Sequence, residues 1–328
     1  MFTPHSRFSR RALLQSMAFA SAAALLPLPA RSQSVQARIL VGFSAGGSID
    51  ALARVLSDKL KDELKRSVIV DNRPGAGGRI AVGVLNSSAR DGRTMLLSPD
   101  VLTTMYPFIF KKLNYETSDL VPVSQISEFA SALAVSTESG IATVQQLVEL
   151  MRKNPEKASF GVSASGSQMH FLGLMFGTAI GVKLEPVPFQ GSAPMMANLI
   201  GGQIPCTIDV EGSLIEQHKA GKIRMLAVSS PRRTLLAPDV PTFTELGFPT
   251  VVGTGANALY AARNVPAAAM REWEHALATI LAMPDVRAKM MELGFTPAPL
   301  SGEAFAKYAD AQAKRWEPII RASGFSVE

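Results

Sequence analysis

The stretch Arg38–Leu56 reads RILVGFSAGGSIDALARVL, and it decides the first unit of the fold. A short apolar run, Ile39–Val41, leads into a glycine-rich segment. From Ile49 onward apolar residues recur at intervals of three and four, which is the spacing of one helix face. The stretch therefore predicts a strand, a glycine-rich loop and a helix, with Ser48 as the N-cap. Free backbone N–H groups and the helix dipole make such a loop a seat for a negatively charged group.

The same design recurs in the second half of the chain. Ala158–Val162 predicts a strand, Ser163–Ser167 a loop of small residues, and Gln168–Ile180 a capped helix. Two anion-binding loops with the same pattern, one in each half of the chain, suggest a cleft with a helix N-terminus on each wall.

The first 32 residues have the pattern of a leader. Three arginines lie within residues 7–11, an apolar Ala/Leu-rich core spans 12–28, and a small-residue exit site lies at 30–32. This is typical of a signal peptide cleaved near residue 32, and it predicts a periplasmic protein. Residues 9–14 also resemble a twin-arginine signal, so both the Sec and the twin-arginine export routes stay open.

Charge and cysteine content exclude several classes of protein. The formal charge of +6 falls to +2 when residues 1–32 are removed, because four of the arginines lie there. We therefore expect no nucleic-acid partner. No later apolar segment reaches the roughly 18 residues needed to span a bilayer. Cys206 is the single cysteine, which excludes a disulfide framework or a cysteine metal cluster, and we expect it to be a small buried residue.

The rest of the chain alternates between strand and helix patterns. This order predicts an α/β fold whose first three strands form a parallel sheet with right-handed crossovers. Leu120–Ile126 and Ala132–Val135 indicate two separate strands, either a hairpin or a crossing between domains. Helices over 267–282, 285–293 and 302–322 end the chain and must pack on an earlier sheet.

Enzyme motifs are largely missing. No Gly-Lys-Ser/Thr phosphate loop occurs, and the glycines at 75–78 do not have the spacing of a dinucleotide fingerprint, so we expect no cofactor. No His, Asp or Glu residues have metal-ligand spacing. A Ser–His hydrolase using Ser163 or Ser165 with His170 is conceivable, although a hydrogen bond from His170 to a loop or to a residue behind the site is the simpler interpretation. Two anion loops without catalytic residues favour a solute receptor that closes about a hinge.

Seven motifs occur in the same order as in a known family. The chain resembles the Bug family, the periplasmic receptors of tripartite tricarboxylate transporters, over essentially its whole length after the leader. The motifs are Phe43–Asp50, Asp71–Gly78, Asp91–Thr94, Val187–Pro194, Gly201–Ile204, Lys219–Arg224 and Pro238–Thr242.

This resemblance implies a Venus-flytrap fold of the periplasmic-binding-protein type, with two α/β domains and a central cleft. Domain 1 would be built from residues 33–134 and 255–328, and domain 2 from 135–254. It also implies a monomer that holds a small carboxylate by backbone amides and ordered waters and delivers it to the permease subunits of a membrane transporter. A ligand-dependent sensor with a signalling partner is the alternative that the sequence does not separate from it.

The resemblance also assigns ligand-binding positions by motif. They are Phe43, Ser44, Ala45, Gly46, Gly47 and Asp50 in the first loop, Ser98 on the variable side, Ser163, Ala164, Ser165, Gly166, Ser167 and His170 in the second loop, and Gln190, Gly191 and Asp209 at other strand ends. Three departures concern the site. The second loop has only one glycine in Ala164–Gly166, where the family commonly has two. Gly42 stands where the family usually has proline, which we expect to loosen the first turn slightly, and Phe189 stands where tyrosine is usual.

Overall fold

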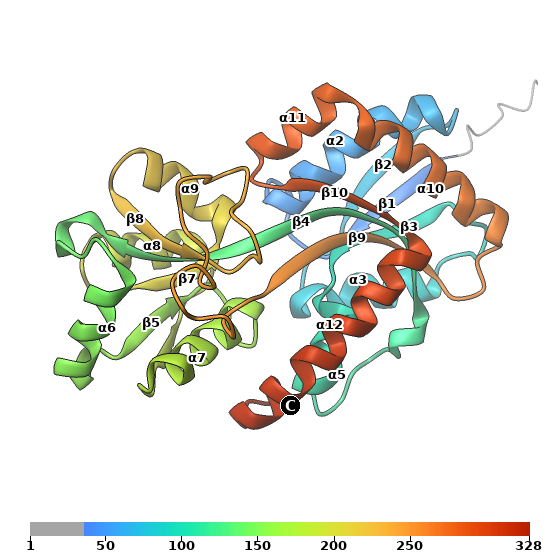
Figure 1. The fold of residues 1–328 in the computed structure, drawn as a ribbon. Helices are drawn as coiled ribbons and strands as arrows, with labels where there is room; N and C mark the ends of the chain where they lie inside the picture. The colour runs from blue at the N-terminus through green and yellow to red at the C-terminus, as the bar shows by residue number, and fades with distance from the viewer. Residues whose placement is uncertain (1–35) are drawn as a thin grey trace, which may run out of the picture. The chain divides into compact units, whose positions relative to one another are not determined.

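The structure is a computed structural model that describes residues 36–328, which form one compact unit. The predicted signal peptide and its cleavage site lie outside the described residues. Ten strands form one sheet in the order β2-β1-β3-β9-β4-β7-β5-β6, and β8 and β10 each pair with β4 beside this path (Figure 1). Among residues 36–328, no helix has both the length and the apolar character that a membrane crossing requires.

The amino-terminal strands form the parallel arrangement that the sequence predicts. The central strand β1 pairs in parallel with β2 on one side and β3 on the other, and its residues are almost all buried. Helix α2 follows β1 and turns Leu52, Leu56 and Leu60 inward. The bounds are β1 Ala37–Val41, α2 Ser48–Glu63, β2 Val68–Asn72, α3 Arg79–Ser87, β3 Thr94–Pro99, α4 Val101–Thr104 and α5 Tyr106–Ile109.

The predicted N-cap of the first helix is wrong by one residue. Gly47 occupies the cap position with extended dihedral angles, and Ser48 is the first helical residue. The cap makes no side-chain hydrogen bond, so the first turn of α2 leaves its backbone N–H groups free of a capping side chain.

The two strands predicted over 120–135 are one strand. β4, Leu120–Ser136, runs without a break through the whole molecule. Its first part pairs with β9 and β10, and its second part with β7 and β8 (Figure 1). The polar residues Ser127 and Glu128 interrupt the apolar run but not the pairing, because β9 continues alongside as far as Ala130. β4 therefore belongs to both halves of the sheet.

The second half of the sheet repeats the strand–helix logic. β5 pairs in parallel with β6 and β7, and α7 follows β5 directly. The bounds are α6 Val144–Lys153, β5 Ser159–Val162, α7 Gln168–Ile180, β6 Glu185–Pro188, α8 Ser192–Ile200, β7 Thr207–Val210, α9 Glu211–Lys219 and β8 Ile223–Val228.

The carboxyl-terminal segment packs against both halves. Its long helix α12 buries Phe305 in the core of the first half, whereas Trp316 and Ile320 complete the core of the second. The predicted domain boundaries remain a prediction, because residues 36–328 form one unit by their contacts. The bounds are β9 Thr254–Ala262, α10 Ala267–Ala282, α11 Pro284–Glu292, β10 Thr296–Ser301 and α12 Gly302–Ser323, of which β10 was not predicted.

Strand direction brings the predicted loops toward one another. β1 and β3 run in the direction of β4, whereas β5 and β7 run against it, so the two sets of carboxyl ends point at each other. Pro99 at the end of β3 is aligned through Asn257 with Ser127 of β4, and Val210 at the end of β7 is aligned with Ser131. Ser127 and Ser131 are four residues apart on β4, and four residues along a strand span about 13 Å.

Candidate functional site

The loop between β1 and α2 is a tight turn over residues 44–47. The N–H of Gly47 donates to the carbonyl of Ser44 at 3.3 Å, and Gly46 between them has a φ of 82°. Glycine suits that left-handed position because a side chain there would be strained. Residues 44–48 are exposed, so the turn presents its backbone at the surface.

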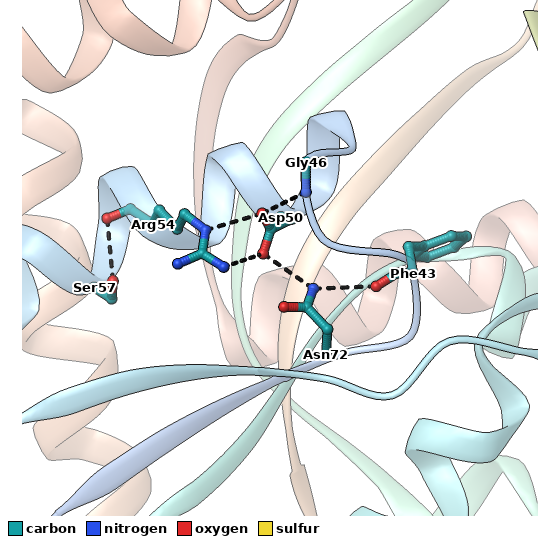
Figure 2. Close-up of polar contacts among 6 residues, drawn as sticks. All are labelled: Phe43, Gly46, Asp50, Arg54, Ser57 and Asn72. Atoms are coloured by element: carbon teal, nitrogen blue, oxygen red, sulfur yellow. Dashed lines mark hydrogen bonds and ion pairs between the residues drawn. The ribbon is translucent and has the colours of Figure 1, made fainter.

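Asp50 supports this turn from inside (Figure 2). Its Oδ2 accepts the N–H of Gly46 at 2.9 Å and the Nε–H of Arg54 at 2.9 Å. Its Oδ1 accepts from Arg54 Nη2 at 3.1 Å and from the Asn72 amide at 3.0 Å. The Asn72 amide also donates to the carbonyl of Phe43, so the network ties both ends of the turn to β2.

The network fixes the charge of Asp50. Its side chain is only 2% exposed, and the hydrogen bonds from Arg54, Gly46 and Asn72 outweigh burial and lower its pKa to about 2. The carboxylate is therefore ionised at neutral pH, with both oxygens engaged within the protein. Asp50, predicted as a ligand-binding residue, is a buried support of the turn in this structure.

The loop between β5 and α7 has the same geometry. The N–H of Ser167 donates to the carbonyl of Ala164 at 3.4 Å, and Gly166 has a φ of 71°. The N–H of Gly166 donates to Nδ1 of His170 at 3.0 Å, four residues later, as Gly46 donates to Asp50. The helix is capped, as predicted: Ser167 is the N-cap of α7, and its Oγ accepts the N–H of His170.

His170 is held in one neutral form by this contact. Because Nδ1 accepts a hydrogen bond, the ring proton of the neutral side chain resides on Nε2. Burial lowers the pKa of His170, which favours the same neutral state. The predicted hydrogen bond between His170 and a loop is confirmed, and the loop is its own.

Three further predicted residues meet at the carboxyl ends of β5 and β7. Ser163 donates its Oγ–H to Oδ1 of Asp209 at 2.7 Å, and its carbonyl accepts the N–H of Gly191 at 3.0 Å. Asp209 is fully buried, which raises its pKa, while the Ser192 and Ser163 side chains act in the opposite direction. Gln190 beside them is exposed. Neither Ser163 nor Ser165 hydrogen-bonds to His170 within residues 36–328, so the geometry gives the hydrolase alternative no support.

The chain directly after β1 packs closely against the turn at 76–78. A Cβ atom on Gly42 would lie 2.5 Å from the Cα of Gly78, so this glycine permits direct backbone contact with the turn at 76–78. Ser98 is buried beneath the same turn, and its Oγ has no hydrogen-bond partner among the described residues. That Gly42 loosens the first turn stays a prediction, and the structure adds that this glycine permits a tight contact with Gly78.

A groove of about 1610 Å³ lies between α7 and the end of α12. Ser165 and His170 line it, together with Arg315 and Phe325, which were not predicted from the sequence. Arg315 donates to the carbonyl of Val252, and burial lowers its pKa. The apolar residue directly after Gly324, which ends α12, was the one available signal for Phe325, since a hydrophobic contact often follows such a glycine.

Other chemistry finds little support in the described part of the chain. Within residues 36–328 no three His, Cys, Asp or Glu side chains gather closely enough to hold a metal ion. Cys206 is fully buried, as predicted, and burial raises the pKa of its thiol to about 12. A thiol in that state is a poor nucleophile.

Comparisons with known proteins agree on one family. The profile described as "Tripartite tricarboxylate transporter family receptor" matches residues 52–325. Protein BugT of Bordetella pertussis is 29% identical over 296 residues, which cover 89% of this chain and 90% of BugT. The UPF0065 protein in the tcbD-tcbE intergenic region of Pseudomonas sp. (strain P51) is 29% identical over 286 residues, covering 86% of this chain and 84% of that protein.

Solved structures agree with the predicted fold. The structure described as R. palustris Rpa4515 with adipate has a TM-score of 0.80 and 28% identity, and the match covers 89% of this chain and 98% of that one. The periplasmic binding protein BugD has a TM-score of 0.76 and 26% identity, with 89% and 99% covered. The periplasmic-binding-protein fold is therefore confirmed.

Proposed function

The chain belongs to the tripartite tricarboxylate transporter receptor family, and we propose that it captures a small carboxylate at its two turn–helix units. The family is one of periplasmic solute-binding receptors. The proposal adds that the turns at 44–47 and 164–167 each offer backbone N–H groups to one ligand, and that the protein acts as a monomer in the periplasm and hands the ligand to membrane permease subunits.

The equivalence of the two turns carries this proposal. Each turn has a left-handed glycine, opens a helix and is braced by a side chain one helical turn later. A helix N-terminus attracts anions because its first N–H groups lack partners and its dipole is positive there. Within residues 36–328, the N–H groups of Ala45 and Ser165 donate no hydrogen bond, so both remain available.

The topology favours a ligand held from two sides, and a relative favours a carboxylate. The strand ends below the two turns point toward each other along β4, so a ligand could be held from both sides. The R. palustris relative is described as a structure with adipate, a dicarboxylate. Periplasmic relatives and the predicted signal peptide support export, and the family supports a permease partner.

A calorimetric and thermal-shift screen of mono-, di- and tricarboxylates tests the proposal. A ligand at 100 times its Kd should stabilise the protein by about 2.7 kcal/mol. A screen in which no carboxylate stabilises the protein or releases heat would overturn the proposal. Amines and neutral sugars of the same size serve as negative controls.

Two proline variants locate the site. Ala45 and Ser165 are the second residues of their turns, a position that tolerates proline, so Ala45→Pro and Ser165→Pro each delete one N–H group with little change of backbone. Each should weaken carboxylate binding about ten- to hundredfold, because a hydrogen bond to a charged group contributes roughly 1.5–3 kcal/mol. Ala45→Ser and Ser165→Ala keep the N–H and should bind as the wild type does.

A further inference from the structure

The chain after α12 returns to the first half of the molecule. The N–H of Val327 donates to the carbonyl of Ile109 at 2.9 Å, and the N–H of Lys111 donates to the carbonyl of Val327 at 3.0 Å. Phe110 and Val327 thus form a short parallel bridge beside α5. Two backbone hydrogen bonds therefore fix the path of residues 324–328, here called the terminal segment.

The terminal segment places one aromatic ring on the second turn. Phe325 is its only residue of intermediate burial, and the other four are exposed. Its Cε1 lies 2.8 Å from the point where a Cβ of Gly166 would stand, and its ring centroid is 4.8 Å from that of His170 in an edge-to-face arrangement. Ile109 approaches the same point of Gly166 to 3.6 Å, so the turn glycine is covered from two sides.

We propose that Phe325 is a positioning residue, which holds the second turn in its ligand-ready geometry by packing on Gly166 and His170. The inference rests on the proposed function only for its consequence in ligand binding. Its structural content is that the end of the chain, bound to α5, fixes a turn that lies about 160 residues earlier in the sequence.

The contact acts through the hydrogen bond between Gly166 and His170. That bond requires Nδ1 of His170 to be unprotonated, and an apolar ring against the imidazole disfavours the protonated form. Among the charged side chains that line the groove with His170, Lys183 pairs with Glu185, and Arg315 donates to the Val252 carbonyl. Burial is the cause of the lowered pKa of His170, and Phe325 contributes to that burial.

Two ligand-free measurements test the proposal on the purified full chain. NMR titration of the histidine side chains, with His170→Gln to assign the signal, gives the pKa of His170. Hydrogen exchange of the Gly166 amide reports opening of the turn. In Phe325→Ala the pKa of His170 should rise toward 6.5, and the Gly166 amide should exchange up to about tenfold faster, since an aromatic pair contributes roughly 0.5–1.5 kcal/mol. Phe325→Leu should restore much of the wild-type behaviour.

The matched control is Glu328→Gln, which removes only the exposed ion pair between Lys111 and Glu328 and should change neither readout. A folded Phe325→Ala protein with unchanged His170 titration and unchanged Gly166 exchange would overturn the inference. Calorimetry with adipate as the probe adds the functional consequence, a several-fold weaker affinity in Phe325→Ala. If adipate and the other carboxylates of the screen fail to bind the wild type, the proposed function fails, while the NMR and exchange results still decide the role of Phe325.

Discussion

Ser131 and Ser229 exchange two hydrogen bonds at the point where the first half of the sheet gives way to the second. The N–H of Ser131 donates to Oγ of Ser229 at 2.9 Å, and the N–H of Ser229 donates to the carbonyl of Ser131 at 2.8 Å. The Ser229 hydroxyl in turn donates to the carbonyl of Gly253 at 2.6 Å. One fully buried hydroxyl therefore joins β4 to the chain that leads into β9.

Replacing this hydroxyl should destabilise the protein. Ser229→Ala leaves the Ser131 N–H and the Gly253 carbonyl unpaired in the interior, and we expect a loss of about 1–3 kcal/mol in the free energy of unfolding. Urea unfolding followed by circular dichroism measures it. Ser131→Ala is the control, because the Ser131 Oγ is buried without a partner among residues 36–328 and its removal should cost almost nothing. Equal losses in the two variants would contradict this account.

The ionised Asp50 should stabilise the first turn in a pH-dependent manner. Its pKa is about 2 in the folded state and near its ordinary value of 3.8 when unfolded. The contribution of Asp50 to the stability of the folded state is therefore complete above pH 3.8, and it is lost as the pH falls from 3.8 toward 2. Asp50→Asn should lower the free energy of unfolding by about 2 kcal/mol at pH 7, with a smaller difference at pH 2.5.

The control for Asp50 is its main partner. Arg54 is 57% exposed, so solvent screens its charge, and Arg54→Gln should cost less than Asp50→Asn. Urea unfolding at both pH values measures the two variants. A loss in Asp50→Asn that is the same at pH 2.5 and pH 7 would show that the carboxylate charge does not support the turn.

Local sequence patterns predicted the two turn–helix units well. Small residues between an apolar run and an amphipathic stretch leave few alternatives to a strand, a turn and a helix. The cap on the second helix was expected because this unit repeats the first, and the loop contact of His170 because it lies one turn into that helix. Cys206 was likewise placed correctly, because a lone small residue in an apolar run is most often buried.

Contacts distant in sequence could not be predicted in the same way. The family resemblance assigned Asp50 to the ligand, and no local pattern shows that Asn72, 22 residues later, donates to its carboxylate. β4 looked interrupted in the sequence because Ser127 and Glu128 break its apolar run, and the pairing that keeps it continuous is with β9, more than a hundred residues away. Phe325 reaches Gly166 through a bridge to Phe110 that no local pattern encodes.

Gly42 should not tolerate a side chain. A methyl group there would meet the Cα of Gly78 at 2.5 Å, and neither backbone segment can yield as a flexible side chain would. We expect Gly42→Ala to lower the free energy of unfolding by about 1–3 kcal/mol through overpacking. Gly83→Ala in nearby α3 is the matched control, because nothing lies within 4 Å of its Cβ position, and it should stabilise the helix by about 0.5–1 kcal/mol. Thermal unfolding of both variants measures these effects. A Gly42→Ala protein that is as stable as the wild type would contradict the close contact.

The second turn should weaken in mild acid, unlike the first. The pKa of His170 is lowered from 6.5 by burial, so the unfolded chain takes up a proton at a higher pH than the folded protein does. Stability from this group is complete above pH 6.5 and declines as the pH falls below 6.5 toward the lower folded value. A protonated Nδ1 also cannot accept the Gly166 N–H. His170→Gln keeps a side-chain acceptor but does not titrate. As the pH falls from 7.5 to 5.5, the wild type should therefore lose more unfolding free energy than His170→Gln does. Contributions from other titrating groups are the same in both proteins and cancel in the difference. A difference that is constant over this range would mean that the imidazole does not control the turn.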